Sequence, residues 1–122
     1  MENVKIAVVE SDEMIRSFVV DLLTYCINRQ VLSFEGSESA WAYFEENADI
    51  DIFVLEADLH NGLELISKIK QKDTEKICVA MSSNPEDEIS AVNLGADAFL
   101  AKPFNMDDLF NVVQTFVTKD VN

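Results

Sequence analysis

The stretch IFVLEADLHNGLEL, residues 52–65, decides the fold, because four apolar residues end at Glu56 and a second carboxylate follows at Asp58. An unbroken apolar run bounded by polar residues is typical of a strand buried on both faces of a parallel sheet. Further along, Leu65, Ile66 and Ile69 have helical spacing. A strand followed by a helix is therefore predicted, with Glu56 at the carboxyl end of the strand.

The same alternation continues along the whole chain and predicts a parallel sheet with helices on both faces. The expected strands are residues 5–10, 30–35, 51–56, 77–82 and 98–103. The stripes expected to be buried on the helices are Ile15, Phe18, Val19, Leu22 and Leu23, then Trp41 and Phe44, then Leu65, Ile66 and Ile69, then Ile89 and Val92, then Leu109, Val112, Val113 and Phe116. The fold class is therefore α/β, a (βα)₅ doubly wound five-stranded parallel sheet in one domain over residues 1–122.

Composition narrows the possible functions. A net charge of −14 would repel a phosphate backbone, so direct binding of nucleic acid or of an anionic membrane is not expected. No apolar run approaches the roughly 20 residues that span a bilayer, and the acidic N-terminal segment differs from a secretion signal. A cytoplasmic location is expected.

The two cysteines and the basic cluster have simple interpretations. Cys26 and Cys78 lie in apolar patterns far apart, so both are expected to be small buried residues rather than a disulfide or metal pair. Lysines 68, 70, 72 and 76 are expected to form the solvated end of a helix, where cations complement the helix dipole.

Ionisable and hydroxyl residues stand where four of the expected strands end, and ligands of doubly wound sheets bind at these carboxyl ends. They are Glu10, Ser11 and Asp12, then Glu56 and Asp58, then Ser82 and Ser83, then Lys102 before Pro103. Two carboxylates about 5 Å apart at an effective dielectric near 20 repel by about 3 kcal/mol. We therefore expect a counter-charge from Lys102 or from Mg²⁺, in a site suited to phosphoryl chemistry.

Four segments resemble the receiver domain of bacterial response regulators: IAVVESDEMIRSFV (6–19), DIFVLEADLHNGLELI (51–66), VAMSS (79–83) and NLGADAFLAKPF (93–104). The resemblance covers essentially the whole chain, and residues 94–104 are its most specific part. It implies a flavodoxin-like strand order 2-1-3-4-5 and a role in two-component (phosphorelay) signal transduction. In that family an acidic pair after the first strand holds Mg²⁺, and an aspartate ending the third strand accepts a phosphoryl group from a histidine kinase.

Several positions match the family. The resemblance implies that Ser82 is the hydroxyl switch, Phe99 the aromatic switch and Lys102 the lysine that contacts the phosphoryl group. Pro103 is expected to follow a cis peptide bond. Ser82 as a group that only satisfies the backbone, and Phe99 as a core residue, remain as alternatives.

Other positions depart from the family. Glu10 keeps an acid at the first position of the metal-binding pair, but Ser11 replaces the second acid, and Glu56 stands at the phosphoacceptor position. Glutamate is longer than aspartate by one C–C bond, about 1.5 Å, and a shift of that size costs about 10²-fold where positioning is most of the catalysis. Mg²⁺ binding by Glu10 and Glu56 is therefore expected to be weakened or lost.

Two acids have alternative roles. Asp58 is an alternative acceptor, and the family's usual backbone metal ligand maps near it. Asp12 either joins the acidic pocket or caps the first helix.

The main hypothesis is a pseudo-receiver that is no enzyme beyond weak self-phosphorylation and dephosphorylation, and that signals through protein contacts. A histidine kinase, a downstream effector or a second copy would bind the face formed by the fourth helix, fifth strand and fifth helix. The first alternative is a working receiver phosphorylated at Glu56 or Asp58 with Mg²⁺. The second is a small flavin-binding or hydrolytic protein of similar topology, against which the scarcity of glycine argues.

Overall fold

The predicted apolar runs form one parallel sheet in the computed structural model, which describes residues 4–58 and 60–118. Its strand order is β2-β1-β3-β4-β5, so the predicted fold class and strand order are confirmed. The strands are β1 (Lys5–Val9), β2 (Gln30–Phe34), β3 (Ile52–Glu56), β4 (Ile77–Ser82) and β5 (Ala98–Ala101). The register pairs Val9 with Phe34 and Leu55, and Ser82 with Ala101, so the carboxyl ends of the strands meet at one edge.

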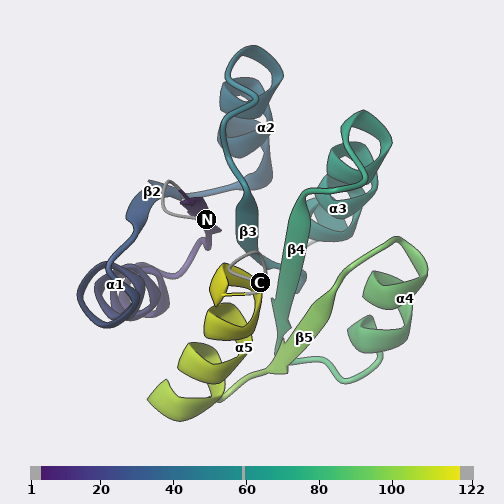
Figure 1. Cartoon of the computed structure of the whole chain (residues 1–122). Helices are drawn as coiled ribbons and strands as arrows, with labels where there is room; N and C mark the ends of the chain where they lie inside the picture. Colours follow the sequence, from purple (N-terminus) through teal and green to yellow (C-terminus); the bar gives the residue numbers. More distant parts are fainter. Residues whose placement is uncertain (1–3, 59, 119–122) are drawn as a thin grey trace.

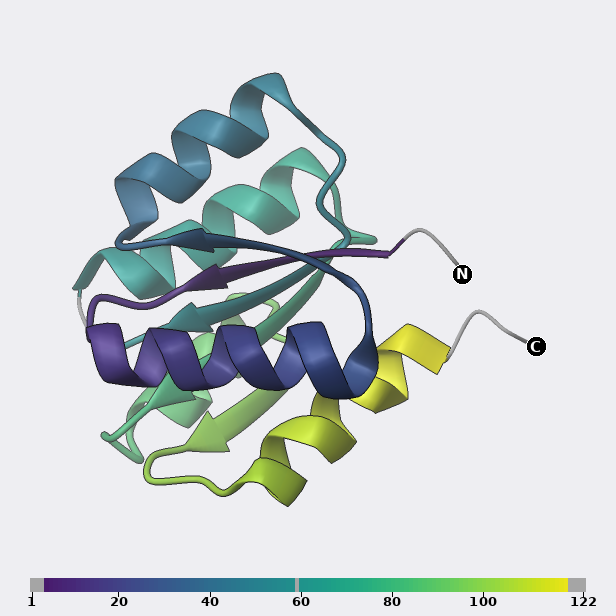
Figure 2. The ribbon, with the colours of Figure 1, turned by 90° about the vertical axis from the view of Figure 1, so that its left-hand side faces the viewer.

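Helices cover both faces of the sheet (Figures 1 and 2). One face carries α1 (Glu13–Leu22) and α5 (Met106–Thr118), and the other carries α2 (Ser37–Glu46), α3 (His60–Lys72) and α4 (Asp87–Asn93). Two apolar clusters fill the space between the sheet and these layers. Alternate residues of β1 supply them: Ile6 and Val8 face α1 and α5, whereas Ala7 and Val9 face α2 and α3.

Helix α1 is extended by a single π-helical segment, η1 (Leu23–Ile27), which ends at Asn28 in the left-handed conformation with φ 60°. At the start of α1, the Asp12 side chain accepts a hydrogen bond from the backbone N–H of Ile15. At the start of α5, Asn105 Oδ1 accepts a hydrogen bond from the N–H of Asp108 at 2.8 Å and caps the helix. Within the described residues, none of the helices has the length and apolar character needed to cross a bilayer.

Several predictions about burial were wrong. Phe18, expected in the buried stripe of α1, is 37% exposed. Ile89 and Val92 on α4 are 70% and 53% exposed, because this seven-residue helix packs on the sheet through Ala91 instead. Trp41 is partly exposed at the groove between α2 and α3 rather than a core residue. Cys26 is exposed on η1, whereas Cys78 is buried as predicted.

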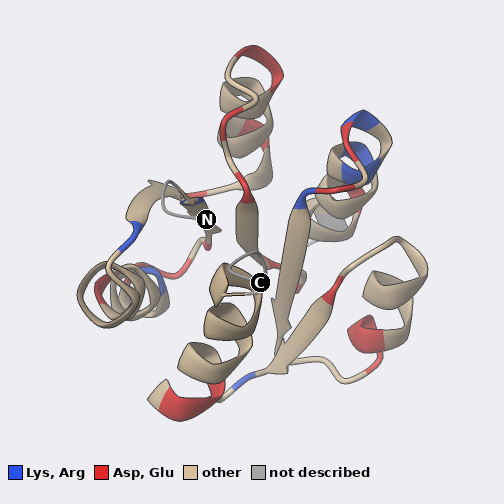
Figure 3. Ribbon diagram, in the orientation of Figure 1, with Lys and Arg blue, Asp and Glu red and all other residues tan. Residues whose placement is uncertain are grey.

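The charges are unevenly distributed (Figure 3). Basic residues gather at the carboxyl end of α3, with Lys70 and Lys72 in its last turn, and in the turn that follows. Acidic residues are spread over the remaining helices, including the first turns of α4 and α5.

Candidate functional site

Backbone hydrogen bonds fix the positions of the strand ends that carry the site. The N–H of Glu10 donates to the carbonyl oxygen of Phe34 at 3.0 Å, and the N–H of Lys102 donates to that of Ser82 at 2.8 Å. These bonds continue the β-ladder one residue past β1 and β5. Glu10, Glu56 and Lys102 are therefore held by the sheet itself rather than by loops.

The Lys102 ammonium lies among three carboxylates. Its Nζ is 3.0 Å from Glu10 Oε1, 3.5 Å from Glu56 Oε2 and 3.4 Å from Asp58 Oδ1. The predicted convergence of the strand tips on Lys102 is thus present in the structure. With three negative charges and one positive charge, the cluster keeps a negative excess.

The second oxygen of each carboxylate accepts hydrogen bonds from the loops. Glu10 Oε2 accepts from the N–H of Asp12 at 3.1 Å, and Glu56 Oε1 accepts from the N–H and hydroxyl of Ser11 at 3.2 and 2.8 Å. Asp58 Oδ2 accepts from the N–H and hydroxyl of Ser83. Each acid is therefore oriented, with one oxygen fixed by a loop and the other turned to Lys102.

Burial disfavours the charged form of Glu10, whose side chain is fully buried. Burial raises the pKa of Glu10 above its ordinary 4.5, against the lowering effects of the Asp12 N–H and of Lys102. Burial also acts to lower the pKa of Lys102. The Glu10 carboxylate, followed by the charges of Asp58 and Glu56, outweighs this effect and holds that pKa above 10.5.

Asp58 shows the opposite behaviour to Glu10. Burial acts to raise the pKa of Asp58, but the hydrogen bonds from the Ser83 side chain and backbone, together with Lys102, hold that pKa below its ordinary 3.8. Asp58 is therefore the carboxylate whose charged form its surroundings favour.

The donor set does not fit the Mg²⁺ site that the resemblance implies. The position where the three free carboxylate oxygens converge is taken by the Lys102 ammonium, and Ser11, at the second position of the family's acidic pair, donates hydrogen bonds instead of supplying a carboxylate. Among the residues described, no three or more His, Cys, Asp or Glu side chains are arranged as a metal site. Lys102 therefore does here what a bound cation would do.

A cavity of about 560 Å³ opens beside the cluster. Its polar wall contains the three carboxylates, Lys102, Ser11, Asp12 and Ser83. Its other wall is apolar and consists of Ile15 and Phe18 from α1 and Pro103 and Phe104 after β5. The site is thus half ionic and half apolar.

The remaining predicted residues take different places. Asp12 lines the cavity and also caps α1, so both of its alternatives apply. The hydroxyl of Ser82 is turned to Asp87 Oδ2, 2.6 Å away at the start of α4, and is not among the cavity residues. Phe99 packs partly buried against the core on the α2–α3–α4 face. The Lys102–Pro103 peptide bond is cis, the isomer expected from the resemblance.

For two residues of the site the sequence analysis predicted no specific role, although it placed Ser83 beside Ser82 at the end of the fourth strand. Ser83, rather than Ser82, contacts the carboxylate cluster, because successive residues at a strand end point to opposite sides. Arg16 donates from Nη1 to the carbonyl oxygen of Glu10 at 2.9 Å and so fixes the loop after β1. Its helical position one turn past Asp12 was the only available signal.

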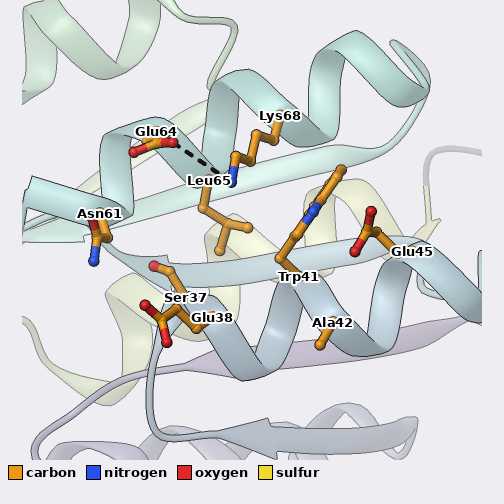
Figure 4. Close-up of a pocket in the computed structure, with 9 residues that line it drawn as sticks. All are labelled: Ser37, Glu38, Trp41, Ala42, Glu45, Asn61, Glu64, Leu65 and Lys68. Atoms are coloured by element: carbon orange, nitrogen blue, oxygen red, sulfur yellow. Dashed lines mark ion pairs between the residues drawn. The ribbon is translucent and has the colours of Figure 1, made fainter.

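A second cavity, of about 360 Å³, lies between α2 and α3 (Figure 4). Trp41 faces Lys68 across it, with Nζ 5.6 Å from the ring centroid, and Lys68 also pairs with Glu64. None of the predicted site residues lines this cavity.

Comparison with known proteins agrees with this geometry. Residues 6–114 match the response regulator receiver domain family, so the chain belongs to that family. It is a receiver domain of the kind found in two-component signalling, where response regulators interact with histidine kinases and effectors.

Similar proteins include a chemotaxis protein CheY homolog of Campylobacter jejuni, 27% identical over 82% of each chain. The response regulator ArlR of Staphylococcus haemolyticus is also 27% identical, over 86% of this chain but only 48% of its own length. This chain therefore spans about half of ArlR. Among solved structures, the BeF3-activated receiver domain of DrrB from Thermotoga maritima superposes with a TM-score of 0.82 and 28% identity, covering 94% of this chain and 97% of that one.

Proposed function

We propose that this receiver domain transmits signals through protein contacts without ordinary phosphorylation, with Glu56 as a permanent charge at the acceptor position. The observation that carries the proposal is the contact of the Lys102 ammonium with Glu10, Glu56 and Asp58, all within 3.5 Å. In a working site this ammonium would be available to an incoming phosphoryl group.

The surroundings of Glu56 argue against its acting as a nucleophile. Oε1 accepts two hydrogen bonds from Ser11, and Oε2 faces Lys102. Both lone pairs of Oε1 are occupied by Ser11, and an attack on phosphorus from Oε2 would compete with its contact to Lys102. The added phosphoryl charge would also enter a cluster that is already negative and lacks a fitting metal site, and positioning and charge neutralisation are most of this chemistry.

A fixed glutamate imitates the phosphorylated state only in part. A phosphoryl group brings about −1.5 to −2 charges and three acceptor oxygens, whereas Glu56 brings one charge and two oxygens. We propose that the domain is held in one signalling state by the Glu56–Lys102 contact and that partner binding reads this state.

The partner is proposed to be a signalling protein, a kinase, an effector or a second copy, on the face formed by α4, β5 and α5. Ile89 and Val92 of α4 are exposed there beside the acidic residues at its start. Exposed apolar side chains rimmed by charge mark protein contact sites. The acidity favours a partner with a basic patch over nucleic acid.

Intact-mass measurement after incubation with acetyl phosphate and Mg²⁺ tests the proposal. We expect no phosphoryl adduct on the unaltered chain, and we expect one on the double variant Ser11→Asp, Glu56→Asp, which restores the family's acids. An adduct on the unaltered chain would overturn the proposal.

Asp58 is the alternative acceptor. Its side chain is 23% exposed, against 11% for Glu56, and lines the same cavity. If the unaltered chain does gain phosphoryl mass, loss of the adduct in Asp58→Asn but not in Glu56→Gln would assign the working-receiver function to Asp58.

A further inference from the structure

The acidic cluster has a negative excess that its own residues do not balance. Glu10 Oε1 is fully buried and accepts no hydrogen bond, although Lys102 Nζ lies 3.0 Å away. One ammonium also faces Glu56 and Asp58, at longer distances of 3.5 and 3.4 Å. A buried carboxylate oxygen without a donor is a costly feature, and it lies at the cavity beside the cluster.

The shape and lining of the cavity indicate the size of the missing group. Its volume of about 560 Å³ falls within the range of about 300–1,000 Å³ that is typical of small-molecule sites. It lies at the carboxyl ends of β1 and β3, which flank the point where strand order reverses, the usual ligand position in this architecture.

The apolar wall argues against a bare metal ion or a phosphate as the occupant. Phe18 of α1 and Phe104 after β5 face each other with ring centroids 6.3 Å apart, and Ile15 and Pro103 complete the wall. A hydrated metal ion gains nothing from these side chains, and an anion would be repelled by the carboxylates. A neutral apolar molecule would leave the negative excess unpaired.

We propose that this cavity binds a small amphipathic amine, with its ammonium on Glu56 and Asp58 and its apolar body against the paired rings of Phe18 and Phe104. If a second cation pairs with those two carboxylates, Lys102 can pair with Glu10 alone, the buried carboxylate of the cluster. The ligand would also join α1 to the segment after β5. The inference rests on the proposed function, because a phosphoryl group on Glu56 would fill the same space.

The test is an NMR titration of the isotope-labelled full chain with phenethylamine, using phenethyl alcohol as its neutral analogue at the same ionic strength. The backbone amides of Ser11, Asp12 and Ser83 report on the cavity. We expect saturable shifts with the amine, with a Kd on the order of 1 mM for a probe of this size, and binding of the alcohol weaker by about tenfold.

Variants separate the two halves of the site. We expect Glu56→Gln and Phe18→Ala each to weaken amine binding by about tenfold. Glu64→Gln removes the same charge from α3, outside this cavity, and should leave binding unchanged. If Glu56→Gln does not fold, the amine and alcohol titrations of the unaltered chain still decide the question.

Equal binding of amine and alcohol, absence of saturation, or shifts confined to the groove around Trp41 would overturn the inference. The acetyl phosphate measurement contains no amine, so the two proposals fail separately. If the chain gains no phosphoryl mass and does not bind phenethylamine, the proposed function stands and the amine proposal is overturned.

Discussion

At the scale of single residues, Lys102 partly balances the charge of the three carboxylates that surround it. Its side chain is 12% exposed and faces Glu10, which has no exposed surface at all. Removing one partner from such a pair leaves a buried charge without compensation, which typically costs about 3–5 kcal/mol. The ion pair is therefore weak evidence of net stability but strong evidence that its two partners depend on each other.

We expect Lys102→Met to lower the free energy of unfolding by about 3–5 kcal/mol at neutral pH, measured by urea denaturation. Lys68→Met is the matched control. Lys68 is 46% exposed and pairs with Glu64 along α3, so its loss should cost less than about 1 kcal/mol. Equal effects of the two variants would mean that Lys102 does not balance the cluster.

The pKa values of two carboxylates of the cluster, Glu10 and Asp58, should be shifted in opposite directions. Carboxyl-carbon NMR should give Glu10 a midpoint above 4.5, because burial disfavours its charge, and Asp58 a midpoint below 3.8, because Ser83 and Lys102 favour its charge. In Lys102→Met, the midpoint of Asp58 should rise. An Asp58 midpoint that does not move in this variant would contradict the contact with Lys102.

The signs of these shifts fix their effect on stability. Asp58 stabilises the fold above its unfolded pKa, and this stability is lost as pH falls through the lower folded pKa. Glu10 has a raised folded pKa, so the folded state takes up a proton first and gains stability as pH falls from that value towards 4.5. The two residues therefore partly offset each other under acidic conditions.

At the scale of elements, the contact between β3 and α3 determines where Glu56 lies. Gly62, in the first turn of α3, packs so closely on β3 that an added Cβ would collide with the carbonyl oxygen of Glu56 and approach Ala57 Cα at 2.9 Å. Both obstacles are backbone, so neither can move aside without shifting the strand end. The missing side chain at Gly62 thus allows α3 to approach the end of β3 this closely.

Gly62→Ala should lower the free energy of unfolding by about 2 kcal/mol or more, because a clash with backbone atoms can be removed only by shifting the strand end. Urea denaturation measures this cost, and the amide shift of Ser11, which donates to Glu56, should report the displaced strand end. Gly36→Ala is the control. A Cβ on Gly36 meets nothing within 4 Å, so its cost should stay near that of an altered N-cap, below about 1 kcal/mol.

Elements with a strong local signal could be predicted from the sequence. The strands followed from uninterrupted apolar runs, and β3 lies within one residue of its predicted bounds. The buried face of α4 was predicted wrongly from the apolar spacing. This seven-residue helix packs through a single small residue, Ala91, while Ile89 and Val92 face outwards. The π-helical segment that exposes Cys26 was not predicted from the sequence; in the structure it contacts α5 and β2.

The candidate site was predictable only to the level of strand ends. Sheet topology brings the ends of β1, β3 and β5, which carry Glu10, Glu56 and Lys102, to one edge, and the resemblance to receiver domains implied that strand order. The sequence did not predict which serine donates hydrogen bonds to the cluster, because Ser82 and Ser83 differ only in the direction that their side chains take at the end of β4. The exact orientation of a strand's last residue depends on the loop beyond it.

At the scale of the whole molecule, self-repulsion should govern the response to salt. The net charge is −14, whereas the surface ion pairs that salt would weaken contribute at most about 1 kcal/mol each. Raising ionic strength from about 0.01 M to 0.15 M shortens the screening length from about 30 Å to about 8 Å. We therefore expect the melting temperature to rise by several degrees with NaCl in a calorimetric scan.

The same scan with MgCl₂ at matched ionic strength separates screening from binding. The quantity to compare is the melting temperature in MgCl₂ minus the melting temperature in NaCl. Because the Lys102 ammonium stands where a cation would bind, we expect this difference to be no larger for the unaltered chain than for Glu56→Gln. A ligand that binds the folded state at 100 times its Kd adds about 2.7 kcal/mol, an effect that a scan would readily detect. Extra stabilisation by Mg²⁺ that disappears in Glu56→Gln would mean that the cation displaces Lys102 and that the metal-dependent chemistry of the family is retained.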